Sequence, residues 1–541
     1  MKGSRQLLEA SLRPRLFLLL GFSAAMAFKP ALALAGPILP KPLAVDVNTD
    51  VYRQTVTGDG ARSFLINGTF QKTNIDAYFN QPSEKGPSLS SRLSLQASDD
   101  PLVMGRGDRY KALGGFFILS KPQHYRLEGG YLIPKATRAT LTATVLGLGG
   151  YYQFNAPGRV TRLSVIGGQT QPGVEGSQFQ RGVAGGMASQ AFGGDKGSLQ
   201  LFASFYRMED VENSIKHRSG LPRLSIYVYS FGSELRSKLG LGLDWELAFL
   251  QNEKGSTGEV HGNALRISPS FKSDHLSAAA NFERNSPRFI NPLGSAAPDV
   301  KKVDGSLTIG RVNQLSLNSL YTQNNVENQL PATRRTQITR ASSRLVPFQQ
   351  AEFWKVFSVD AEYSVSRSGE RSAVTESRLA ALGLGLNETY FNTSIRGEYS
   401  PLRDFRDTTV NRDTFRATWQ MGLKLKIAGK VKFDPSWNLS LERSRSLATG
   451  LVDPGGSASG GFTAAYSDLL TLGFRHDFQQ RTSKPTGRKI RNEATQAHLR
   501  LLLKTKAPIQ LGISFARKHY YDTRLNAFGE EELRGSVNVK F

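Results

Sequence analysis

The sequence predicts an all-β chain that closes into one transmembrane antiparallel up-and-down β-barrel of about 22–26 strands. Three observations lead to this prediction. Apolar and polar residues alternate with the two-residue period of a β-strand, over segments of about ten residues. Very short and long connections alternate between these segments, as an antiparallel meander requires. No stretch of the 541 residues reaches the roughly 20 apolar positions of a membrane-spanning helix.

The segment 415–427, FRATWQMGLKLKI, shows the alternation most fully. Its odd positions are all apolar, and its even positions include Arg416, Lys424 and Lys426. A charged side chain on the lipid face of a barrel costs about 2–4 kcal/mol at the membrane midplane, so this strand suits a wall between hydrocarbon and water. We expect the odd positions to face lipid and the even positions to face the lumen. The same alternation recurs at 241–249, 357–365, 437–441, 497–503 and 509–515.

The N-terminus has the pattern of a secretory signal. A basic stretch over residues 2–15 precedes a short apolar run, and Ala33-Leu34-Ala35 supplies a cleavage site of the A-x-A kind. We assign residues 1–35 to a signal peptide, with an uncleaved anchor helix as the alternative. Residues 36–60 are interpreted as a periplasmic lead-in and 61–541 as the barrel. The part from 61 to 190 is rich in Gly and alternates weakly, which leaves open whether some of it is a plug.

The chain is strongly basic. It has 69 Lys and Arg against 45 Asp and Glu, and 64 against 44 without residues 1–35. An exported protein with this charge attracts anions, so the expected partners are lipopolysaccharide, an acidic polysaccharide or small anionic solutes. Nucleic acid fits the charge but not the compartment. The absence of Cys from the sequence excludes disulfides and thiolate metal sites.

The last residues form one more alternating segment. Leu533, Val537, Val539 and Phe541 share one side of it. Together with the signal pattern and the period-two strands, this segment resembles the end of Gram-negative bacterial outer-membrane β-barrels of the porin-like kind. The resemblance covers about residues 60–541 in pattern only and identifies no subfamily. It implies an outer-membrane location among lipid and lipopolysaccharide, and it implies that these four residues are the signal read by the barrel-assembly machinery.

Basic residues on the expected lumen faces are the candidate functional residues. Rings of basic side chains in a pore favour anions. Acidic residues lie on the same faces, among them Glu362, Glu398 and Glu442. The sequence therefore leaves two interpretations open: an anion-attracting wall, or charges that pair across strands and only hydrate the wall. The candidate lumen-lining residues are Arg396, Arg412, Arg416, Lys424, Lys426, Arg500 and Arg534.

Two further basic clusters fall where the sequence predicts long connections. One lies within 334–344 and the other within 481–491. We expect solvated loops there, with binding of lipopolysaccharide phosphates as the functional alternative.

The sequence offers no catalytic or cofactor site. Its seven His are scattered, without an H-E-x-x-H pair, and no G-x-S-x-G elbow occurs. We therefore expect no enzyme, no metal and no cofactor. The leading prediction is an outer-membrane channel, either a diffusion pore for polar or anionic solutes or an exporter of an acidic polysaccharide. The alternative is a structural barrel with a plugged lumen that scaffolds a surface or periplasmic complex.

Overall fold

The structure is a computed structural model. The expected signal peptide, residues 1–35, lies outside the residues that it describes. It describes residues 44–541, apart from 60–62, 64, 82–86, 102–109, 133–135, 138, 171–179, 195, 212–223, 254–259, 329–331, 348–355, 371–372, 428 and 485.

All strands of the described residues belong to one antiparallel sheet. In the first half of the chain they are β1 (Ala44–Gly58), β2 (Gly68–Gln81), β3 (Ser88–Ser98), β4 (Tyr110–Lys121), β5 (Tyr125–Leu132), β6 (Val145–Ala156), β7 (Arg159–Thr170), β8 (Arg181–Gly194), β9 (Gly197–Asp210), β10 (Ser225–Ser237), β11 (Leu241–Asn252), β12 (Val260–Lys272), β13 (Leu276–Asn285) and β14 (Val300–Ile309). In the second half they are β15 (Gln314–Asn324), β16 (Arg334–Leu345), β17 (Phe357–Glu370), β18 (Ala373–Asn387), β19 (Phe391–Asp404), β20 (Arg412–Leu423), β21 (Leu425–Ile427), β22 (Val431–Ser446), β23 (Val452–Tyr466), β24 (Leu470–Ser483), β25 (Arg488–Leu503), β26 (Ile509–Asp522) and β27 (Leu525–Lys540). One 3-10 turn, η6 (Thr408–Val410), joins β19 to β20.

The labels β20 and β21 cover a single strand. Gly422 pairs with Ser436 of β22 and Leu425 pairs with Phe433, so the register does not change between them. The interruption lies opposite Pro435, which has no backbone N–H to donate to the ladder. The barrel therefore has 26 strands, within the predicted range.

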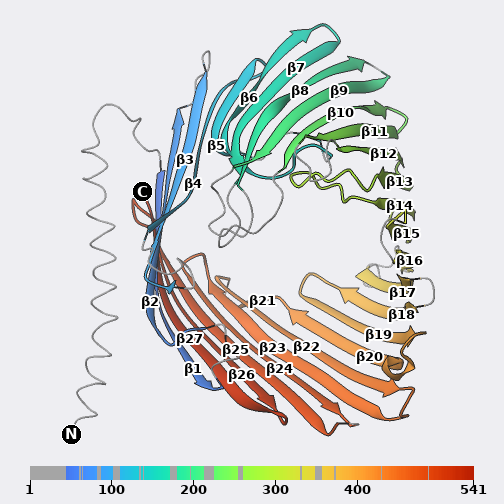
Figure 1. Ribbon diagram of the computed structural model, residues 1–541. Helices are drawn as coiled ribbons and strands as arrows, with labels where there is room; N and C mark the ends of the chain where they lie inside the picture. The colour runs from blue at the N-terminus through green and yellow to red at the C-terminus, as the bar shows by residue number, and fades with distance from the viewer. Residues whose placement is uncertain are drawn as a thin grey trace.

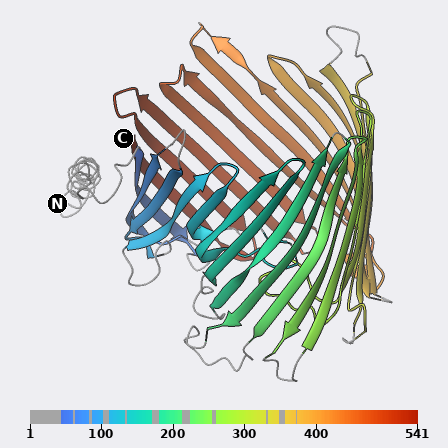
Figure 2. The ribbon, with the colours of Figure 1, turned by 90° about the horizontal axis from the view of Figure 1, so that it is seen from above.

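The sheet closes because the first strand pairs with the last. β1 pairs with β27 from Asp46↔Lys540 to Gly58↔Phe528, and β1 also pairs with β2. Figure 1 shows the resulting ring of strands, and Figure 2 shows the strands tilted along the wall. A closed sheet has no free edge, so every strand satisfies its backbone groups against two neighbours. This confirms the predicted closed antiparallel barrel.

The lead-in predicted for residues 36–60 is wrong for residues 44–58. These residues are β1, in the wall itself. The sequence carried the signal in weak form, because Val45, Val47 and Val51 alternate with Asp46, Asn48 and Asp50. The polar residues of this alternation line the lumen. Because they make up half of the segment, its composition resembles that of a soluble linker.

Residues 61–190 contribute β2–β8 to the wall. Their alternation is weak because Gly replaces side chains where neighbouring backbones approach closely. A Cβ on Gly147 of β6 would lie 2.1 Å from the carbonyl oxygen of Gly167 of β7. A Cβ on Gly168 would lie 2.4 Å from the carbonyl oxygen of Leu146, and one on Gly185 would lie 2.3 Å from that of Phe205. The glycines permit a sharp bend of the wall at β5–β8 (Figure 1), as glycine kinks do in curved sheets.

The two ends of the barrel differ in their connections. We call the end that holds Ala44 and Lys540 the proximal end and the opposite one the distal end. Proximal turns are mostly short, such as 157–158 between β6 and β7, whereas distal connections include 171–180 and 211–224. Barrels of the outer membrane have short periplasmic turns and longer extracellular loops, so the proximal end is the periplasmic one.

The two faces of the wall match the expected alternation. On β20 and β21, Phe415 is 57% exposed and Ile427 is 51% exposed, on the outer face. Arg412, Arg416 and Thr418 line a cavity on the inner face. An apolar outer band around a polar interior is the arrangement of an outer-membrane barrel.

Two adjacent small residues test this assignment of faces. The native chain has no Cys, so single-Cys variants carry one thiol. We expect Thr418→Cys, on the inner face, to react with a charged, membrane-impermeant maleimide in reconstituted vesicles. Ala417→Cys, on the outer face, should react only after detergent solubilisation. Equal labelling of both variants in vesicles would contradict the alternation.

The glycine bend gives a second prediction. Gly147→Ala places a methyl group against backbone that has to move, and such overpacking costs about 1–3 kcal/mol. We expect a lower yield of folded barrel, measured by the heat-modifiable migration of unboiled samples in SDS gels. Gly167→Ala is the matched control on the neighbouring strand, because nothing lies within 4 Å of its added Cβ. Equal yields for the two variants would refute the packing argument.

Candidate functional site

The inner face of β18–β24 forms a polar wall. It borders a cavity of about 720 Å³ whose lining includes Arg412, Glu398, Gln479 and the hydroxyls of Thr414 and Ser457. A second cavity of about 700 Å³ lies nearer the proximal end. The wall is polar because every second residue of each strand points into the lumen, where it meets water and not lipid.

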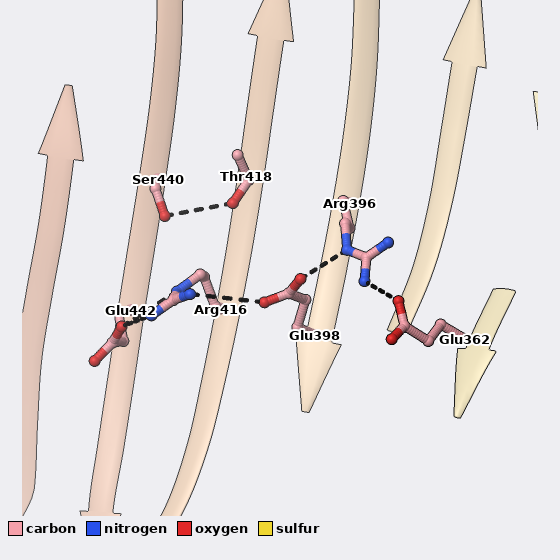
Figure 3. Close-up of polar contacts among 7 residues, drawn as sticks. All are labelled: Glu362, Arg396, Glu398, Arg416, Thr418, Ser440 and Glu442. Atoms are coloured by element: carbon pink, nitrogen blue, oxygen red, sulfur yellow. Dashed lines mark hydrogen bonds and ion pairs between the residues drawn. The ribbon is translucent and has the colours of Figure 1, made fainter. Parts of the chain in front are cut away.

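Charged residues of this wall and of the adjoining strands β16 and β17 form a continuous ladder across the strands, which we call the lumen ladder. Its members are Arg340, Glu362, Arg396, Glu398, Arg416 and Glu442. Figure 3 shows five of them pointing toward one another from neighbouring strands.

Alternating signs hold the lumen ladder together. Glu362 accepts from Arg340 Nε at 2.8 Å and from an Arg396 terminal nitrogen at 2.9 Å. Arg396 Nε donates to Glu398 at 2.7 Å, and Arg416 lies 3.8 Å from Glu398 and 2.5 Å from Glu442. Three guanidinium groups and three carboxylates thus neutralise one another along the wall.

The predicted lumen residues fall into two groups. Arg396, Arg416 and Arg534 are paired with carboxylates, the last with Glu532 at 2.9 Å. Arg412, Lys424, Lys426 and Arg500 face the same side of their strands without a carboxylate within 4.0 Å among the described residues; Arg500 donates to Gln510. The first group fits the interpretation of charges that pair on the wall, and the second group fits the interpretation of an anion-attracting wall.

The residues predicted as an assembly signal lie on β27 and just after it. Leu533 is 53% exposed on the outer face, and Val537 shares that face. Val539 is buried, while Phe541 exchanges backbone hydrogen bonds with Val45 of β1 at 2.9 Å and 3.2 Å. These residues complete the closure of the wall, and their recognition by assembly machinery stays a prediction.

The opposite side of the lumen is apolar and covered. Two inward segments, 139–143 after β5 and 289–296 after β13, lie inside the ring of strands (Figure 1). We call their buried apolar residues, together with those of the wall that they contact, the inner cluster. The wall contributes inward-facing residues of β8–β12, and Val228 and Ala248 are completely buried. Phe289 and Leu141 of the inward segments are also completely buried.

Hydrogen bonds join the two inward segments to each other. Asn291, itself buried, donates through Nδ2 to the carbonyl oxygens of Ala139 at 2.6 Å and Thr140 at 2.8 Å. The backbone N–H of Thr142 donates to Leu293 at 2.8 Å. The inner cluster is therefore a fixed part of the lumen that narrows it on one side, next to β8–β12.

The sequence left open a plug within residues 61–190, where the segment with Leu141 lies, but we did not identify the inner cluster from it. A signal for the cluster existed. At its distal end β10 is apolar on both faces, as in Ile226, Tyr227, Val228 and Tyr229. Loss of alternation in a barrel strand indicates that the inner face is covered by chain instead of water.

The described residues contain no metal or helical membrane motif. No group of three or more His, Cys, Asp or Glu in that part of the chain is arranged to hold a metal ion. Its helices include none that is long and apolar enough to cross a membrane.

The chain matches no protein-family model and no curated protein sequence. Similar solved structures include the translocation pore of the P pilus usher PapC, with 10% identity over 91% of this chain and 99% of that chain and a TM-score of 0.41. The Escherichia coli outer-membrane transporter YddB has 10% identity over 93% and 81%, with a TM-score of 0.42. Wzi, a carbohydrate-binding barrel involved in group 1 capsule assembly in Escherichia coli, has 12% identity over 60% and 81%, with a TM-score of 0.31.

The lumen ladder yields a third prediction. Glu398→Gln removes the carboxylate between Arg396 and Arg416 and leaves one extra positive charge on the wall. In a planar bilayer with a KCl gradient, we expect the reversal potential to shift toward anion preference relative to the wild type. The free energy of unfolding should change by less than about 1 kcal/mol, the scale of solvent-exposed ion pairs.

The reverse substitution supplies the control for that prediction. Arg416→Gln frees two carboxylates, so its reversal potential should move in the opposite direction, and the double variant should return close to the wild type. Shifts of the same sign in both single variants would exclude an electrostatic role for the lumen ladder.

Proposed function

We propose that the chain is an outer-membrane channel for polar and anionic solutes, with an acidic polysaccharide as the favoured large substrate. The observation that carries the proposal is the division of the lumen. One side is packed with the inner cluster, and the other is a hydrated polar wall bordered by cavities of about 720 and 700 Å³. A barrel of 26 strands is wide enough for a water-filled passage beside the cluster.

The charge of the wall supports an anionic substrate. The lumen ladder is neutral as a unit, whereas Arg412, Lys424, Lys426 and Arg500 add cations without a nearby carboxylate among the described residues. Hydroxyl and amide side chains between them suit a sugar, because each can donate or accept a hydrogen bond. Repeated weak contacts of this kind hold a polyanion while letting it move, as conduction requires.

The alternative is a barrel that scaffolds a surface or periplasmic complex. The inner cluster favours it, because Asn291, Phe289 and Leu141 are buried in the manner of a permanent plug. In that case the polar wall serves only to hydrate the interior.

Planar-bilayer recording separates the two functions. We expect the purified barrel to form long-lived conducting steps, with a reversal potential in a KCl gradient that indicates anion preference. Reversible block by a polyuronate, and none by a neutral dextran of equal size, is expected for the polysaccharide substrate. Absence of conductance would refute the channel and favour the scaffold, and conductance with equal block by both polymers would refute only the polysaccharide.

A further inference from the structure

The outer surface of the barrel is asymmetric along its axis. In β1 and β16–β27, uncharged residues fill the outward positions from the proximal strand ends through the middle of the wall. Among the described residues of these strands, charged side chains appear on the outer face only in the distal part. On β22, for example, the outward series runs Val431, Phe433, Trp437 and Leu441 before Arg443.

Strand length explains why charged side chains can lie on the distal part of the outer face: the longer strands extend beyond the hydrocarbon of the membrane. At 3.4 Å per residue and a tilt near 45°, the 16 residues of β22 cover roughly 38 Å of the barrel axis, against an apolar band of about 25 Å. The 10 residues of β13 cover only roughly 24 Å. The long strands therefore stand above the hydrocarbon by two or three outward positions, at the level of lipid headgroups.

The outward positions in this extension are mainly basic, and half of the basic residues are held by carboxylates. Arg367 and Arg378 both contact Glu376 at 2.6 Å. The other pairs are Arg403 with Asp413, Arg491 with Glu493, and Arg517 with Glu531.

Five more cations share this surface. They are Arg53, Arg335, Arg443, Arg445 and Lys489, and none has a carboxylate within 4.0 Å among the residues that the structure describes. Ten cations against four carboxylates on one face leave an excess of positive charge, which we call the outer basic belt. The belt faces lipid, not the lumen, so the substrate of the channel does not account for it.

From the sequence we expected part of this belt to lie in two solvated loops. Arg335 faces outward whereas Arg340 of the same cluster belongs to the lumen ladder. Likewise Lys489 and Arg491 face outward, and Arg488 faces inward to Asp522 at 2.6 Å. The cluster at 334–344 spans β16, and the cluster at 481–491 spans the adjoining ends of β24 and β25; in both, alternating residues divide between the two faces.

We propose that the outer basic belt binds the phosphates of lipopolysaccharide in the outer leaflet around one half of the barrel. Guanidinium groups bind phosphate through paired N–H donors, and arginine is enriched where phosphate is recognised. The belt lies on the distal, surface-facing end and at headgroup height, where phosphate groups of the outer leaflet are found. The inference concerns the lipid-facing surface and is independent of what passes through the lumen.

A charge-matched pair of triple variants tests the proposal. The first is Arg443→Gln with Arg445→Gln and Lys489→Gln, all on the outer belt. The control is Arg334→Gln with Arg412→Gln and Arg481→Gln, which removes the same charge near the distal ends of β16, β20 and β24 on the inner face. Binding of purified lipopolysaccharide to the folded barrel in detergent is measured by microscale thermophoresis.

We expect the belt variant to bind lipopolysaccharide roughly 100-fold more weakly, at about five-fold per basic residue near an anionic lipid surface. The inner-face control should bind like the wild type, and dephosphorylated lipopolysaccharide should bind the wild type as weakly as the belt variant binds the intact lipid. Equal losses in both triple variants, or no effect of removing the phosphates, would overturn the proposal.

Folding is checked on the same samples by heat-modifiable migration. Should the belt triple variant fail to fold, Arg443→Gln alone is expected to weaken binding about five-fold, and Arg443→Lys to bind within about two-fold of the wild type. A single Arg443→Gln variant with unchanged affinity would count against the belt.

Discussion

The closure of the sheet by β1 and β27 is the contact on which the rest of the structure depends. Hydrocarbon offers no hydrogen-bond partner, so each backbone N–H and C=O of the wall has to find one in a neighbouring strand. The pairing from Asp46↔Lys540 to Gly58↔Phe528 supplies those partners to the two strands that would otherwise be edges. Once the ring is closed, each strand has one face toward lipid and one toward the lumen, and every other property of the molecule follows from that division.

The period of two was enough to predict the class, the number of strands within the given range, and the faces of segments such as 415–427. It was not enough to locate strands in which one face has few apolar or few polar side chains. Residues 44–58 were missed because only Val45, Val47 and Val51 mark their lipid side. The glycines around Gly147 and Gly185 hide the alternation because the backbone, and not a side chain, fills the space there.

Pairing between distant residues could not be predicted from one sequence. Arg396 meets Glu362, 34 positions earlier, only because the intervening strand β18 sets the register of both neighbours. The division of the 481–491 cluster between two faces depends on strand ends that extend beyond the apolar band, and single-sequence patterns locate such ends poorly. The inner cluster required knowing that two connections, more than 140 residues apart, fold into the same part of the lumen.

The inner face of the wall is stabilised differently in the two halves of the barrel. Along β8–β12 the inner face is apolar near the distal end, and the inward segments cover it; leaving a Val or Leu there in water would cost about 1.5–3 kcal/mol. Along β16–β27 the inner face is polar and charged, and it is stable against water without a cover. A passage for solutes therefore fits beside the polar wall at this level, because widening it by removing the inner cluster would expose the apolar inner face of β8–β12.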